Sequence, residues 1–149
     1  MILVLLIILG ICVLFYLFLN GKRIGDFKKP PVIRHKPHTH IVSLNEEQIK
    51  ERWTSIEEAA AGGEHSLRHA ISEADKLLDQ VLRQRGFAGD TMAERLKKAE
   101  NRFADKEAVW SAHKLRNALA HDVNYDLMMA RGRQAVDDIH RGLRDLGVL

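Results

Sequence analysis

Four polar side chains within nine residues could together act on a phosphate ester: His113, Arg116, Asn117 and His121. An imidazole is suited to proton transfer near neutral pH, and the forked guanidinium of an arginine is suited to phosphate oxygens. Such groups could cleave RNA without a metal, because an imidazole can assist attack by the 2′-hydroxyl while Arg116 offsets the charge that develops on the phosphorane. Asn117 could orient the imidazole. These four residues are the candidate catalytic residues.

The spacing of Arg116 and His121 bears on how such a site would be built. The two residues are five apart, which corresponds to about 140° around a helix axis, so their side chains do not stack as i, i+4 neighbours do. A shared site is easier to build when a second copy of the helix packs across a two-fold axis and brings two arginines and two histidines together. We therefore expect a homodimer.

The helix that carries these residues is expected from about Asp105 to His121. One arc of about 80° collects its small and apolar side chains, which predicts the buried face: Ala104, Ala108, Ala112, Leu115 and Leu119. The opposite side collects Trp110, His113, Asn117 and His121 at intervals of three or four residues. A tryptophan among imidazoles is unusual on a solvated face, so this side predicts a second buried surface, formed with another helix or another protomer.

The rest of residues 42–149 also has helical periodicity, in five segments counting this one. The segment boundaries are capping-box spacings at Ser43–Glu46 and Thr91–Glu94, glycines at 62, 63, 86 and 147, and Asn124, which could cap the last helix. No stretch alternates with the period of a strand. The sequence therefore predicts an all-α fold, an antiparallel bundle of four to five helices.

The run Arg116-Asn117-Ala118-Leu119-Ala120-His121 resembles the motif of HEPN domains, in which an arginine, a polar residue, three further residues and a histidine lie on one helix of an α-helical bundle. The upstream run Ala74-Asp75-Lys76-Leu77-Leu78, followed by residues 86–92, resembles the preceding helix pair and loop of such domains. The likeness covers about residues 66–146.

For this chain the resemblance implies a dimer with a composite, metal-independent ribonuclease site formed by two Arg-polar-His motifs. The positions that carry over are Arg116, Asn117 and His121, and His113 flanks them. Related folds also include members that only bind nucleotides or proteins. A non-catalytic dimerisation or scaffold module and a nucleotide-binding module therefore stay open as alternatives.

The N-terminal residues 1–20 are expected to form a transmembrane helix. Residues 2–19 carry no charge and no proline, and about 18 helical residues nearly span a hydrocarbon core. A basic linker with all three prolines follows over residues 21–41, with six Lys and Arg against one Asp. By the positive-inside rule the N-terminus is outside and the C-terminal domain is cytoplasmic. The linker is expected to contact anionic headgroups of the bilayer.

Charge and cysteine content limit the partners of the domain. Residues 37–149 hold 17 Lys and Arg against 19 Asp and Glu, so net charge gives no support for polyanion binding by the domain. The single cysteine, Cys12, lies in the expected span, and His65 and His69 lack an evident third ligand. We expect no metal and no cofactor. RNA and a regulatory protein are the further candidate partners.

Overall fold

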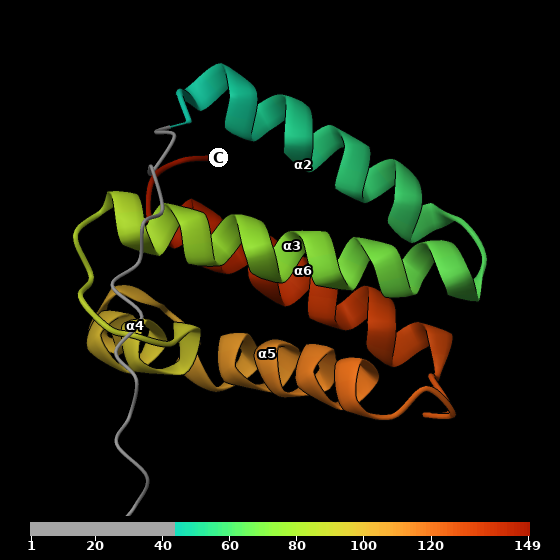
Figure 1. The fold of residues 1–149 in the computed structure, drawn as a ribbon. Helices are drawn as coiled ribbons and strands as arrows, with labels where there is room; N and C mark the ends of the chain where they lie inside the picture. Colours follow the sequence, from blue (N-terminus) through green and yellow to red (C-terminus); the bar gives the residue numbers. More distant parts are fainter. Residues whose placement is uncertain (1–43) are drawn as a thin grey trace, which may run out of the picture. The chain divides into compact units, whose positions relative to one another are not determined.

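Five α-helices and one 3-10 helix follow one another in residues 44–149, the part of the chain that the computed structural model describes (Figure 1). Their bounds are α2 Glu46–Ala61, α3 Glu64–Gln84, α4 Met92–Ala99, η2 Glu100–Arg102, α5 Lys106–His121 and α6 Met129–Asp145. This part of the chain contains no strand. The prediction of an all-α helical bundle is therefore confirmed for the described residues.

The predicted transmembrane helix, residues 1–20, and the predicted linker, residues 21–41, lie outside the described residues. Residues 44–149 contain no helix that is both long enough and apolar enough to cross a membrane.

Helix α3 lies at the centre of the bundle and packs against α2, α4, α5 and α6. Figure 1 shows α2 and α5 on opposite sides of α3, with α6 behind them. The apolar side chains that α3 buries recur at three and four residues: Leu67, Ala70, Ile71, Ala74, Leu77, Leu78, Val81 and Leu82. Each large one stabilises the fold by about 1.5–3 kcal/mol through removal from water, so α3 is the element on which the other helices are positioned.

Two of the expected helix starts are displaced. Asn45, not Ser43, caps α2: its Oδ1 accepts from the Gln48 N–H at 2.8 Å, and the Gln48 Oε1 accepts from the Asn45 N–H at 3.0 Å. Asn124 does not cap α6, which begins after Met128 without a side-chain cap. Asn124 instead donates its backbone N–H to Asp122 Oδ1 at 2.9 Å in the α5–α6 loop. At the start of α2 two cap-forming residues, Ser43 and Asn45, lie close together, so the spacing alone could not choose between them.

The buried face of α5 is rotated relative to the predicted stripe. The buried residues are Val109, Ala112, His113 and Leu115. Ala104 is exposed and precedes the helix, and Leu119 is only partly buried. The rotation follows from the position of α5, which packs against both α3 and α6 and so buries a wider arc than one alanine stripe. As a result His113 points into the protein, and Arg116 lies beside α3.

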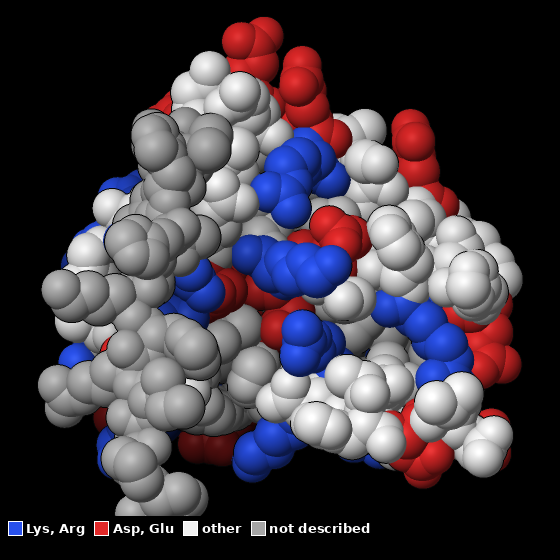
Figure 2. Space-filling view, viewed as in Figure 1, with Lys and Arg blue, Asp and Glu red and all other residues white. Residues whose placement is uncertain are grey.

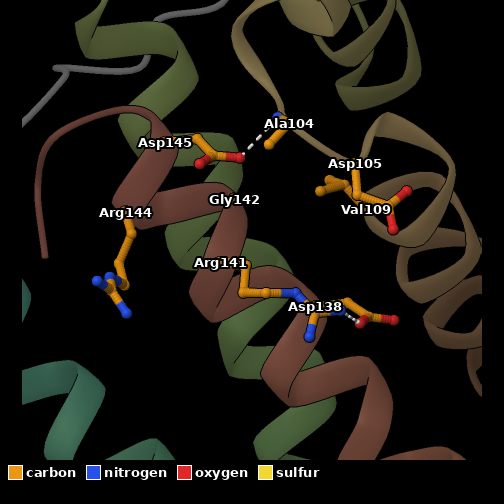
Figure 3. A pocket seen from close by; sticks show the side chains of 8 residues that line it. All are labelled: Ala104, Asp105, Val109, Asp138, Arg141, Gly142, Arg144 and Asp145. Atoms are coloured by element: carbon orange, nitrogen blue, oxygen red, sulfur yellow. Dashed lines mark hydrogen bonds and ion pairs between the residues drawn. The ribbon is translucent and has the colours of Figure 1, made fainter.

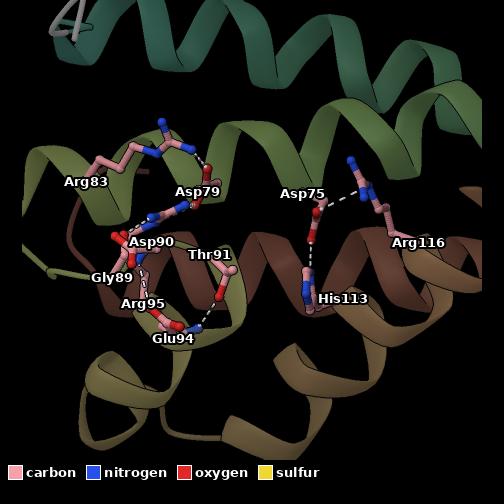
Figure 4. A network of polar contacts seen from close by, with 10 residues as sticks. All are labelled: Asp75, Asp79, Arg83, Gly89, Asp90, Thr91, Glu94, Arg95, His113 and Arg116. Carbon is pink, nitrogen blue, oxygen red and sulfur yellow. Dashed lines mark hydrogen bonds and ion pairs between the residues drawn. The ribbon is translucent and has the colours of Figure 1, made fainter. Parts of the chain in front are cut away.

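The loop between α3 and α4 is held by an arginine. Gly86 ends α3 with a φ of +81°, a conformation that favours glycine. Arg95 on α4 donates through Nε to Asp79 Oδ1 at 2.7 Å and also donates to the Gly89 carbonyl. Arg83 forms an ion pair with the other oxygen of Asp79 at 2.6 Å. These contacts fix the loop against α3 (Figure 4).

Candidate functional site

The site is built on a carboxylate, Asp75, that lies within the apolar face of α3. Ile71, Asp75, Leu78 and Leu82 follow one another at the spacing of a single helical face, and Asp75 is only 3% exposed. A carboxylate removed from water is unfavourable unless hydrogen bonds and opposite charge replace its hydration. The position of Asp75 therefore requires partners, and helix α5 supplies them.

His113 and Arg116 are the two partners of Asp75 (Figure 4). The Nδ1 atom of His113 lies 2.8 Å from Asp75 Oδ1, and Arg116 Nε lies 3.4 Å from Asp75 Oδ2. The His113 side chain is buried, whereas the Arg116 side chain is 31% exposed. Each carboxylate oxygen thus has its own partner, and the guanidinium lies where buried protein meets solvent.

Asn117 joins the two partners of Asp75 to each other. Its Nδ2 lies 3.1 Å from His113 Nε2, and its Oδ1 accepts from Arg116 Nη1 at 3.0 Å. Together the four side chains form a closed ring of contacts: Asp75, His113, Asn117 and Arg116. The imidazole that Asn117 contacts is that of His113, because His113 lies one helical turn before it on the same face.

His121 is the last residue of α5, and its side chain is exposed. Among the described residues no contact joins it to Arg116 or to the ring. The structure therefore brings together three of the four candidate catalytic residues and leaves His121 apart from them within one protomer. The offset of about 140° between residues five apart on a helix accounts for this separation.

Trp110 lies beside the ring. Its indole meets the His113 imidazole edge to face, with ring centroids 6.1 Å apart and planes at 72°, and it is half-buried. Part of the second buried surface predicted for α5 is therefore formed inside the protomer, where His113 contacts Asp75 of α3. The rest of the indole remains accessible to solvent.

Charges of both signs alternate over the face of the molecule that contains α3. Figure 2 shows lysine and arginine side chains interleaved with carboxylates on this face. Glu73 lies 2.7 Å from Lys76 and 3.6 Å from Arg52. The hydrogen bond from Lys76 lowers the pKa of Glu73, although partial burial opposes this shift. A phosphate on this face would therefore meet carboxylates as well as cations.

A cavity of about 330 Å³ lies elsewhere, between the start of α5 and the end of α6 (Figure 3). It contains none of the candidate catalytic residues. Its carboxylates are already engaged: Asp138 accepts from Gln134 at 2.8 Å and from Arg141, and Asp145 accepts the Ala104 N–H at 2.8 Å. We assign it no ligand, because Asp138 and Asp145 are already engaged by protein donors.

Metal binding finds no support in the described part of the chain. No group of three or more His, Cys, Asp or Glu side chains in residues 44–149 is arranged to hold a metal ion. His65 and His69 are exposed on α3 without a third ligand.

Sequence reasoning did not identify Asp75 as a site residue. The signal was a carboxylate in an otherwise apolar stripe, between Ile71 and Leu78 at helical spacing.

Comparison with known proteins gives no match to a family model, a curated protein or a solved structure.

Proposed function

We propose that this chain is a membrane-anchored, cytoplasmic, HEPN-like protein whose α5 motif forms half of a metal-independent RNA-cleaving site. In this proposal two copies associate through α5, and Arg116 of one protomer acts with His121 of the other. Arg116 binds the scissile phosphate and offsets the charge of the phosphorane, while His121 assists proton transfer at the 2′-hydroxyl or the leaving oxygen.

The observation that carries the proposal is the way Arg116 is held. Its guanidinium is fastened by a buried carboxylate and by Asn117, yet about a third of the side chain, 31%, remains exposed. The ion pair with Asp75 is formed through Nε, and the hydrogen bond to Asn117 is donated by Nη1. A cation fixed in this way at a surface is pre-organised for a phosphate oxygen, because little side-chain freedom is lost when the phosphate binds.

The position of His121 supports a site shared between protomers. It lies 5 residues beyond Arg116 at the end of α5, exposed and outside the ring. A general acid or base must reach the reacting oxygen and the solvent, and an exposed imidazole meets both conditions. A two-fold axis near the end of α5 would place the His121 of one copy near the Arg116 of the other.

The test uses the full-length chain, purified in a mild detergent and incubated with single-stranded RNA in EDTA. The native protein is expected to cleave the RNA, and Arg116→Ala and His121→Ala are each expected to lower the rate at least about 100-fold. Lys114→Ala, a matched removal of an exposed cation on the same helix, should leave the rate unchanged. Equal, background-level cleavage by all four proteins would reject the hypothesis that the chain is a ribonuclease.

A mixing experiment tests whether the site is composite. Arg116→Ala and His121→Ala proteins are inactive alone, but a heterodimer of the two contains one site with both an arginine and a histidine when these come from different protomers. Mixing them under subunit exchange should restore up to about half of the activity per heterodimer. Failure of cleavage to return, with heterodimers shown by differential labelling, would place both groups in one protomer.

A non-catalytic dimerisation module is the second candidate. The observation in its favour is that the ring closes on itself: Asp75, His113, Asn117 and Arg116 satisfy one another without a ligand. In that case Arg116 and His121 serve the packing of α5 against a second copy. The Arg116→Ala protein would then change its oligomeric state in analytical ultracentrifugation, and no RNA cleavage would be seen with the native chain.

A further inference from the structure

The direction of each hydrogen bond in the ring can be derived from the chemistry of its members. A guanidinium only donates hydrogen bonds, so the atom of Asn117 that faces Arg116 Nη1 at 3.0 Å must be the amide oxygen. The NH₂ group of Asn117 then faces His113 Nε2 at 3.1 Å. The opposite orientation of the amide would set its NH₂ group against the guanidinium, donor against donor.

The orientation of Asn117 determines the tautomer of His113. Because the Asn117 NH₂ group only donates, Nε2 of His113 must be the acceptor and carries no proton. The ring proton of His113 is therefore on Nδ1, which donates to Asp75 Oδ1 at 2.8 Å. Asp75 Oδ2 forms an ion pair with Arg116, whose Nε lies 3.4 Å away. Every donor in the ring meets an acceptor only when His113 is neutral and Asp75 is ionised.

We propose that Asp75, His113 and Asn117 are positioning residues that act through Arg116, and that His113 is held as the neutral Nδ1–H tautomer. This inference rests on the proposed function for its catalytic consequence. His113 is consequently not a proton-transfer group. Its Nε2 lone pair accepts a hydrogen bond from Asn117, and its Nδ1–H donates a hydrogen bond to Asp75. The ring holds the guanidinium at Asp75 and at Asn117, while 31% of the Arg116 side chain stays exposed toward a phosphate oxygen.

The charged groups that contact His113 and its partners support this assignment. Asp75 from α3 faces Nδ1, Arg116 from α5 lies across the same carboxylate, and the indole of Trp110 covers a ring edge without charge. The guanidinium already neutralises the carboxylate. A second positive charge on His113 would have to direct an Nε2 proton at the NH₂ group of Asn117, which would break the ring at that contact.

The tautomer can be measured directly by nitrogen-15 NMR of the histidine side chains in the full-length chain. The His113 signals, assigned with a His113→Gln protein, are expected to show a protonated Nδ1 and an unprotonated Nε2 at neutral pH. An Nε2–H tautomer, or signals averaged between the two tautomers, would overturn the proposal. The measurement needs no RNA, so its result is separate from the success or failure of the enzyme hypothesis.

Asn117→Asp provides the matched perturbation. A carboxylate at this position accepts from both sides, so it should draw a proton onto Nε2 of His113 and change the imidazole spectrum to that of the doubly protonated ring. Asn101→Asp makes the same chemical change at an exposed residue on η2 and should leave the His113 signals in place. An unchanged His113 spectrum in Asn117→Asp would show that the amide does not set the tautomer.

The positioning of Arg116 is tested by removing its hydrogen bond to Asn117. In Asn117→Ala the Arg116 Nη1 loses its acceptor, so rotation of the guanidinium should become faster in the arginine side-chain spectrum while the helix content is unchanged. Where the native chain cleaves RNA, kcat/KM should fall about tenfold, the order expected for one positioning hydrogen bond. A guanidinium as restrained as in the native chain would overturn the positioning role.

Discussion

Two carboxylates on α3, one helical turn apart, are neutralised in different ways. Asp79 is paired with two arginines, and the deeper one, Arg95, has a side chain that is 5% exposed and also donates to the Gly89 carbonyl. Asp75 is paired with a buried imidazole and with the half-exposed Arg116. In the first network the cation is buried and holds a loop. In the second the cation lies at the surface.

The Asp79 network stabilises the fold, whereas the Asp75 network places a positive charge at the protein surface. The guanidinium of Arg95 donates hydrogen bonds to Asp79 and to the Gly89 carbonyl, both within its own protomer (Figure 4). Arg116 is held at Nε by Asp75 and at Nη1 by Asn117, and its side chain is 31% exposed. Removing Arg95 takes a buried cation away from both Asp79 and the Gly89 carbonyl, whereas removing Arg116 leaves Asp75 with the hydrogen bond from His113. The two arginines should therefore differ in how much folding depends on them.

The largest expected effect is the difference between Arg95→Met and Arg116→Met. Arg95→Met should lower the free energy of unfolding by about 3 kcal/mol, because it removes a buried cation that binds both Asp79 and the Gly89 carbonyl. Arg116→Met should lower it by about 1 kcal/mol, because Asp75 keeps the hydrogen bond from His113. Urea denaturation of the full-length chain, followed by circular dichroism, measures both, with exposed Lys97→Met as the control. Equal losses of unfolding free energy in the two proteins would show that Arg95 and Arg116 contribute alike to folding.

A smaller effect is expected from Gly89→Ala, which disturbs the Asp79 network alone. A Cβ at Gly89 would lie 2.8 Å from the Glu94 Cβ and 3.1 Å from the Arg95 backbone nitrogen. The loop would have to shift, at a cost of about 1–2 kcal/mol in the free energy of unfolding. The NMR signals of His113 should stay where they are, since the Asp75 ring is untouched. Their displacement would show that the two networks are coupled.

The smallest effect concerns Glu73, a third carboxylate on α3 that lies near the surface. Lys76→Met removes its main hydrogen bond, so the pKa of Glu73 should rise toward its ordinary value, as followed by carbon-13 NMR. Because the folded-state pKa is lowered, the stabilisation from this pair is present above the unfolded-state pKa and is lost as pH falls through the folded-state pKa.

At neutral pH the loss of unfolding free energy in Lys76→Met should be below about 1 kcal/mol, as for other surface pairs. The difference from the native chain should vanish in acid. Lys50→Met, an exposed lysine on α2, is the control. A loss as large as that of Arg95→Met would mean that depth does not decide the strength of these pairs.

The helices of the bundle could be predicted because most carry a strong apolar period or a clear end. The stripe of α3 and the glycines at 86 and 147, both with positive φ, gave the ends of α3 and α6. The face of α5 could not be predicted as well. Its stripe is mainly alanine, which stabilises little by burial, so packing between α3 and α6 decided which arc is inside.

The candidate site was only partly readable from sequence. The spacing of His113, Arg116 and Asn117 on one helix indicated that they could meet, because three- and four-residue intervals are local. Asp75 is 38 residues before His113, and no local pattern reports a contact of that range. Without Asp75 the sequence gives no reason for His113 to turn inward.

The two tryptophans of the chain occupy unlike surroundings. Trp53 of α2 is 4% exposed and stacks on His140 of α6, with ring centroids 4.8 Å apart and planes at 16°. Trp110 is half-buried beside His113 on α5. The two indoles thus report on different events: the emission of Trp53 depends on the attachment of α2 to α6, and the emission wavelength of Trp110 depends on what covers α5.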